Sequence, residues 1–138
     1  TIPDIFDLYR YSFWLKPNKG VLDPVRSKAM AIEIDGKRVV LLSLDLVGVS
    51  LALRDQVLAM VPASGLTDSD FIMTATHTHS GPGALTKNLL WETIAVDRFS
   101  GRVFRHVTAK IAESIELALQ RLRPAQLEHM TFAAEGLQ

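Results

Sequence analysis

The segment TATHTHSGPG, residues 74–83, holds the side chains of this sequence that are best suited to chemistry. Its two histidines, His77 and His79, are separated by one residue, so on an extended backbone both imidazoles project to the same side. Neutral imidazole is a good zinc ligand, and a catalytic zinc typically takes three protein ligands and an exchangeable water. The histidine pair therefore predicts part of a metal site.

The same segment also has a structural interpretation. In it, His77 and His79 form a polar strand end that hydrogen-bonds to the neighbouring threonines, because His-x-His is a short pattern with many chance matches. Ser80 beside a histidine allows a nucleophile hypothesis, but Ser-Gly-Pro-Gly lacks the strand-to-helix turn of Gly-x-Ser-x-Gly, which favours a turn. Gly81 and Gly83 carry no side chains and would let the backbone approach a substrate closely.

A β-hairpin is predicted upstream of this segment. Residues 28–34 and 38–45 are rich in β-forming residues, and the Asp35-Gly36 step between them supplies the positive φ that a tight hairpin needs. The second run is almost entirely apolar, which is typical of a central strand covered on both faces. The hairpin therefore places a buried strand directly before residue 46.

A strand–helix–strand unit follows the hairpin. Ser50 is a suitable N-cap for a helix that runs to about Val61, and Pro62 marks its end. The residues expected to face the core are Leu51, Leu58 and Val61. Residues 71–76 form the next predicted buried strand, and the order strand, helix, strand implies parallel pairing with a right-handed crossover.

The C-terminal part of the sequence predicts a long helix and a last strand. The helix spans about residues 100–121 and ends before Pro124, and apolar residues recur along it at intervals of three or four. These residues are Phe104, Val107, Ile111, Ile115, Ala118 and Leu122. Residues 127–133 are the predicted strand. Residues 1–138 thus form one α/β domain with a mixed sheet, which contains a β-hairpin and a parallel strand–helix–strand unit, and helices packed on the sheet.

This fold gives the histidine segment a functional position. Ligands of open α/β sheets bind beyond the carboxyl ends of the strands, where residues 77–83 must lie. Asp45 ends the preceding strand and emerges at the same edge, so it is a direct metal ligand, an orienting partner of an imidazole, or a turn residue. His106 on the long helix and His129 on the last strand are interpreted as surface or interface histidines.

Composition excludes several other classes of protein. Fifteen basic and fifteen acidic residues leave a net charge of zero, with no basic patch for nucleic acid. The sequence has no cysteine, so a metal would depend on histidine and carboxylate ligands. The longest apolar stretches, such as residues 39–44, are too short to cross a bilayer. No signal peptide is recognisable, so one is absent or already removed, and both a secreted or periplasmic and a cytoplasmic location stay open.

Residues 75–83, ATHTHSGPG, resemble the signature of the neutral/alkaline non-lysosomal ceramidase family, in its N-terminal catalytic domain. The resemblance extends upstream to Asp23-Pro24-Val25, to residues 39–50 with their SLDLVG core, and to Leu53-Arg54-Asp55, and it covers roughly residues 20–123. It implies a zinc amidohydrolase that cleaves the N-acyl bond of ceramide. By this resemblance His77 is a zinc ligand, and His79 is the neighbouring active-site histidine that contacts the reacting group.

The resemblance also implies partners. The family's other zinc ligands, a second His, a Glu and a Tyr, come from well downstream, so we expect them beyond Gln138, in the remainder of a larger catalytic domain. The expected substrate is a lipid amide, which makes a peripheral membrane contact possible. The aromatic residues of segment 1–24 could contribute to that contact, although packing into the core is their favoured role. Two alternatives remain: a metal-dependent hydrolase of another amide, an ester or a glycoconjugate, and a non-catalytic α/β binding or assembly module.

Overall fold

The computed structural model describes residues 21–94, 96–131, 133 and 136. Within them the chain forms a three-stranded mixed sheet in the order β1-β2-β3, with helices packed against it. The α/β fold expected from the sequence is confirmed. Most of the aromatic N-terminal segment lies outside the described residues.

The hairpin is built from β1 (Ser27–Ile34) and β2 (Lys37–Leu44), which pair antiparallel. Asp35 and Gly36 form the turn with φ of 51° and 77°. Positive φ at both central residues gives a two-residue turn whose twist matches that of the strands, as Asp-Gly predicts.

The parallel unit consists of β2, α1 (Leu51–Met60) and β3 (Phe71–Ala75). Its strands pair in the register Leu44 with Ala75. The Ser50 hydroxyl accepts the Leu53 N–H at 3.2 Å and caps α1, as predicted. The predicted inward position of Leu51 is wrong, since 76% of it is exposed. As the first residue of α1, Leu51 lies outside the row of buried residues at four-residue spacing, Leu53, Val57 and Val61.

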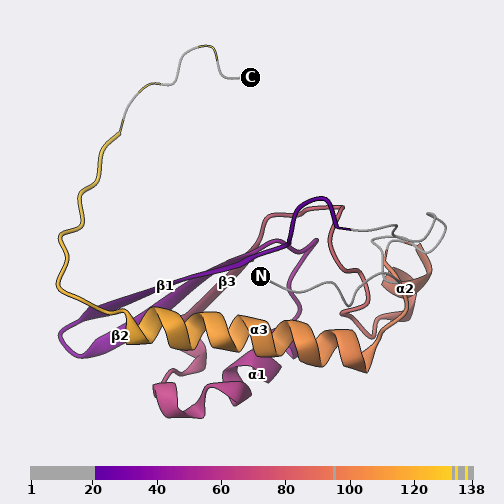
Figure 1. Ribbon diagram of the computed structural model, residues 1–138, viewed down its shortest axis with the longest axis horizontal. Helices are drawn as coiled ribbons and strands as arrows, with labels where there is room; N and C mark the ends of the chain where they lie inside the picture. The colour runs from indigo at the N-terminus through magenta and orange to yellow at the C-terminus, as the bar shows by residue number, and fades with distance from the viewer. Residues whose placement is uncertain (1–20, 95, 132, 134–135, 137–138) are drawn as a thin grey trace.

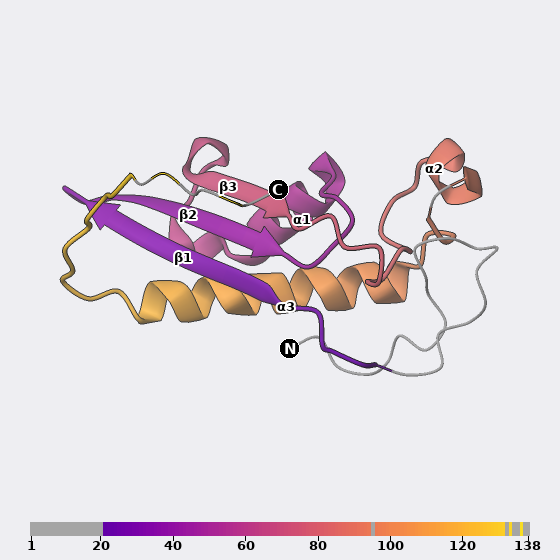
Figure 2. The ribbon, with the colours of Figure 1, turned by 90° about the horizontal axis from the view of Figure 1, so that it is seen from above.

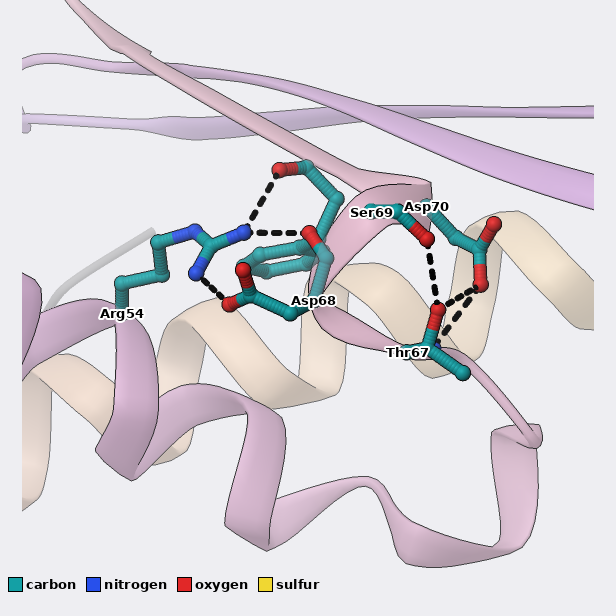
Figure 3. Close-up of polar contacts among 6 residues, drawn as sticks. Arg54, Thr67, Asp68, Ser69 and Asp70 are labelled. Atoms are coloured by element: carbon teal, nitrogen blue, oxygen red, sulfur yellow. Dashed lines mark hydrogen bonds and ion pairs between the residues drawn. The ribbon is translucent and has the colours of Figure 1, made fainter.

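Two short 3₁₀ helices, Pro62–Ser64 and Asp68–Asp70, lead from α1 into β3. The Arg54 side chain joins these elements, because it forms an ion pair with the Asp68 carboxylate and donates to the carbonyl groups of Asp68 and Phe71 (Figure 3). Beside it, the Asp70 carboxylate accepts the Thr67 N–H at 2.9 Å and the Thr67 hydroxyl. The start of β3 is thus fixed by local polar contacts.

Two helices follow β3. The sequence did not predict α2 (Leu89–Ile94), although Asn88 caps it by accepting the N–H groups of Leu90 and Trp91. The long helix α3 (Gly101–Gln120) confirms the predicted helix, and Val107, Ile111 and Ile115 are buried as expected. Phe104 and Ala118 are only half-buried, and Leu122 lies beyond the end of the helix. The fully or nearly fully buried residues of α3 are Val103, Val107, Thr108, Ile111, Ala112 and Ile115.

Helices α1 and α3 lie on the same side of the sheet (Figure 1). Seen from above, the three strands lie side by side, and α3 runs under β1 (Figure 2). Val40, Leu42 and Leu44 point into this core and are at most 2% exposed. On the other face Met30 and Ile72 flank Leu41 in register and are 52% and 50% exposed. The expectation of β2 covered on both faces is therefore not met by the described residues.

The predicted strand at residues 127–133 is wrong in the part that the structure describes. Residues 127–131 and 133 have no regular secondary structure, and Leu127 and Met130 are 91% and 79% exposed. A strand needs a neighbour that pairs with its backbone N–H and C=O groups, and the sheet of the described residues consists of β1, β2 and β3 only. None of the helices in the described ranges has both the length and the hydropathy that a membrane span needs.

Candidate functional site

The loops after β2 and β3 lie side by side at the carboxyl edge of the sheet. The Thr76 N–H donates to the Leu44 carbonyl at 2.9 Å and continues the parallel ladder one residue beyond β3. Residues 45–49 and 76–83 therefore leave the same edge, as the parallel pairing predicts. In open α/β sheets this edge is where ligands bind.

The structure brings the two histidine rings together. The ring centroids of His77 and His79 are 5.0 Å apart with an interplanar angle of 69°, and both residues are exposed. The local backbone differs from the extended conformation assumed from the sequence, because His77 has a φ of 62°. Proximity thus results from a turn after the strand and not from strand alternation.

A positive φ in a residue other than glycine is uncommon, although histidine tolerates it better than most residues. At His77 this conformation accompanies a tertiary contact, since His77 Nδ1 lies 2.6 Å from the Val47 carbonyl oxygen. A carbonyl can only accept, so Nδ1 carries a hydrogen, and in the neutral ring the lone pair is then on Nε2. Metal-ligating histidines are commonly oriented by such a bond from the second ring nitrogen.

Asp45 bonds to the backbone at the start of the neighbouring strand. Its carboxylate Oδ2 accepts the Arg26 N–H at 2.9 Å, and its own N–H donates to the Arg26 carbonyl at 2.9 Å. The carboxylate therefore bonds to the backbone of a residue 19 positions away, directly before the other strand of the hairpin. Its role as a metal ligand or as an orienting partner of an imidazole stays a prediction.

The remaining loop residues differ in burial. Ser80 is exposed, and its N–H donates to the Thr78 hydroxyl at 3.3 Å, as in a turn. Gly81 lies against the Asp45 carbonyl, where an added Cβ would be 3.2 Å from the oxygen. Gly83 is buried. The glycines of the loop are thus packed against the rest of the protein, whereas its histidines are exposed to solvent.

The fit to a metal ion was tested on the donor set. Two neighbouring imidazoles suit zinc, but a catalytic zinc needs a third protein ligand. The described part of the chain contains no group of three or more His, Cys, Asp or Glu residues that could hold a metal ion. Neither Asp45, His106 nor His129 therefore completes such a group with the pair, and the pair fits zinc only as part of a coordination sphere.

His106 is half-buried on α3. Burial lowers its pKa, and the positive charge of Lys110 lowers the pKa further, so its neutral form is favoured. The sequence interpretation of His106 as a surface or interface histidine stays a prediction.

The chain is similar to neutral ceramidases in both sequence and fold. The family model for neutral/alkaline non-lysosomal ceramidase, N-terminal, matches residues 6–135. Neutral ceramidase of Pseudomonas aeruginosa is 35% identical over 106 residues, which cover 73% of this chain and 16% of that protein. The crystal structure of neutral ceramidase from P. aeruginosa matches with a TM-score of 0.58 at 34% identity, over 65% of this chain and 15% of that one. A solved structure of ceramidase complexed with C2 matches with the same TM-score and identity, and the match covers 14% of that chain. The chain therefore spans about one sixth of the relatives that it matches.

Proposed function

Because this chain belongs to the neutral/alkaline non-lysosomal ceramidase family, we propose that it is the N-terminal part of a larger catalytic domain that hydrolyses the N-acyl amide bond of ceramide or a ceramide-like lipid with the help of zinc. The observation that carries this proposal is the state of His77. Its imidazole is exposed at the carboxyl edge of the sheet, and its Nδ1 bonds to the Val47 carbonyl. This bond directs Nε2 away from the carbonyl, so that Nε2 is the nitrogen that would coordinate a metal ion.

His77 Nε2 would hold the zinc ion together with ligands from the rest of the domain. When bound, zinc supplies a nucleophile at neutral pH and polarises the amide carbonyl. His79, with its ring centroid 5.0 Å from that of His77, is placed to donate a hydrogen bond to the amide oxygen or to move a proton to the leaving nitrogen. Residues 80–83 would line the approach of the substrate with backbone.

A ceramide hydrolase must take its substrate from a lipid surface. The proposed partners are thus a lipid amide, a peripheral membrane contact and the remainder of the catalytic domain. The chain's balanced charge gives no reason to include nucleic acid among them.

The test uses the full-length polypeptide and separates zinc binding from turnover. His77→Ala is expected to lose bound zinc, which mass spectrometry measures. Ceramide turnover should fall by more than roughly 10–100-fold, which is the loss typical of removing a residue that only orients a metal ligand. His79→Ala is expected to retain zinc and to lose about 10²–10⁴-fold in turnover. His129→Ala, which changes an exposed histidine outside the site, is the matched control and should match the unmodified protein.

Three results would contradict the proposal. Stoichiometric zinc and full turnover in the His77→Ala protein would remove the metal role. Faster cleavage of other amides, esters or glycoconjugates than of ceramide would change the substrate class. Robust ceramide turnover with stoichiometric zinc by residues 1–138 alone would show that no further part of a catalytic domain is needed.

A further inference from the structure

We infer that Asp45 and Gly81 are positioning residues for His77, because together they fix the loop whose Val47 carbonyl holds the imidazole. The inference rests on the proposed function only for its consequence for zinc, since the arrangement of the loop and the imidazole is a property of this chain alone. Asp45 bonds to Arg26 and Gly81 lies against the Asp45 carbonyl, so their effect on the imidazole must pass through the backbone of residues 45–47.

Asp45 ties this loop to the start of the hairpin by two hydrogen bonds to the same residue. Its N–H donates to the Arg26 carbonyl, and its carboxylate accepts the Arg26 N–H, each at 2.9 Å. The Arg26 N–H would otherwise find its acceptor in the backbone of the opposite strand, as in a regular antiparallel ladder. The carboxylate thus takes the place of a backbone acceptor and frees the chain to turn away from β2.

The turn that follows is tight and anchored in the core. The Leu46 N–H donates to the Leu44 carbonyl at 2.8 Å, which closes a three-residue turn centred on Asp45. The Leu46 side chain is only 2% exposed and belongs to the hydrophobic core. With both Asp45 and Leu46 fixed, the next carbonyl group, that of Val47, points at His77 Nδ1 at 2.6 Å.

Gly81 holds the two loops at the correct separation from the other side. A Cβ at this position would lie 3.2 Å from the Asp45 carbonyl oxygen and 3.4 Å from Thr78 Cγ2, which is tighter than ordinary van der Waals contact at the oxygen. A Cβ here therefore requires the Asp45 carbonyl to shift by a few tenths of an ångström, and a larger side chain requires a larger shift of the loop. Gly48, in the same loop, has nothing within 4 Å of such a Cβ and provides a matched control.

The alternative is that Asp45 and Gly81 only stabilise the fold. The tautomer of His77 separates the two possibilities, because loss of the bond to Val47 removes the constraint that keeps the hydrogen on Nδ1, whatever happens to stability. The tautomer is read from the ¹⁵N chemical shifts of the imidazole nitrogens in metal-free residues 1–138, in mildly alkaline solution where histidine is neutral. Exposed His129 serves as an internal reference.

The unmodified chain should show His77 as the Nδ1–H tautomer. In Asp45→Ala the Nδ1–H population should fall to the value found for His129, and Asp45→Asn should restore it, since the amide oxygen can still accept the Arg26 N–H. Gly81→Val should lower the population strongly, Gly81→Ala less, and Gly48→Ala should leave it unchanged. In the full-length protein, Asp45→Ala should weaken zinc binding by about 10-fold.

An unchanged His77 tautomer in both Asp45→Ala and Gly81→Val would overturn the inference, as would failure of Asp45→Asn to restore it. If Asp45→Ala does not fold, the inference is decided by comparing the Nδ1–H population of His77 in Gly81→Ala with that in Gly48→Ala. A full-length protein that binds no zinc would refute the proposed function but would leave the tautomer result intact, so the two failures are distinguishable.

Discussion

The two ends of β3 use polar residues in opposite ways. At its start, the Arg54 guanidinium contacts a carboxylate and two carbonyl groups, and the Asp70 carboxylate accepts two hydrogen bonds from Thr67 (Figure 3). At its end, His77 adopts a φ of 62°, and two exposed imidazoles face each other across 5.0 Å.

The polar contacts at the start of this five-residue strand form a structural junction, whereas those at its end form the candidate site. At the start, contacts from Arg54 and Thr67 occupy the polar groups, and Thr67 and Phe71 have ordinary extended backbone conformations. At the end, an uncommon backbone conformation is held by one tertiary hydrogen bond, and a ring nitrogen is left with its lone pair. Strained conformations persist where the surroundings hold them, and they concentrate at functional sites. We therefore expect substitutions at the start to change stability and substitutions at the end to change chemistry.

The largest effect on stability is predicted for Arg54→Met. The Met side chain keeps part of the aliphatic packing but removes the ion pair and the bonds to two carbonyl groups, so the free energy of unfolding should fall by about 2 kcal/mol. Denaturant unfolding measures this change. Asp68→Asn is the control, because Asp68 is 75% exposed and its loss should cost less than about 1 kcal/mol. A changed His77 tautomer in Arg54→Met would show that the two ends of β3 are coupled.

A smaller effect is predicted for His77→Gly. Glycine adopts positive φ without cost, so this substitution relieves backbone strain of about 1 kcal/mol. It also removes a hydrogen bond worth about 1 kcal/mol. Because the two effects are opposite, the free energy of unfolding should stay nearly constant. His77→Ala loses the same bond and keeps the strain, so it should be less stable than His77→Gly by about 1 kcal/mol. Equal unfolding midpoints for the two variants would mean that a φ of 62° is not strained here.

Much of the fold was predictable because its signals are local. The Asp35-Gly36 turn, the Ser50 cap and the periodicity of α3 each depend on a few neighbouring residues, and each is confirmed. The inward face of α1 was predicted wrongly at Leu51, because the sheet, and not the helix sequence, decides which row is buried. The strand at residues 127–133 was predicted from the local sequence, and a local sequence does not supply a pairing partner.

The candidate site was predictable in its residues but not in its geometry. The types and spacing of His77 and His79 indicated a metal site and also carried the family resemblance. The φ of 62° at His77 has no sequence signal, since no glycine or asparagine marks it. The Val47 carbonyl lies 30 residues away in sequence, and backbone groups have no residue type that could reveal them. The tie between Asp45 and Arg26 likewise depends on strand register.

The smallest effect is predicted at the start of β3, for the titration of Asp70. The hydrogen bond from the Thr67 hydroxyl, followed by that from the Thr67 N–H, lowers the pKa of Asp70 below its ordinary value. Because the pKa is lower in the folded state than in the unfolded state, this carboxylate stabilises the fold at neutral pH, and the contribution is lost as the pH falls through the folded pKa.

Thr67→Val removes the hydroxyl but keeps the N–H, so the pKa of Asp70 should rise part of the way back. A ¹³C NMR titration of the carboxyl group measures it. The pKa of Glu113, which a hydrogen bond and the charge of Lys110 lower on α3, should not change and is the control. An unchanged Asp70 pKa would mean that the Thr67 N–H, and not the hydroxyl, holds the carboxylate at this junction.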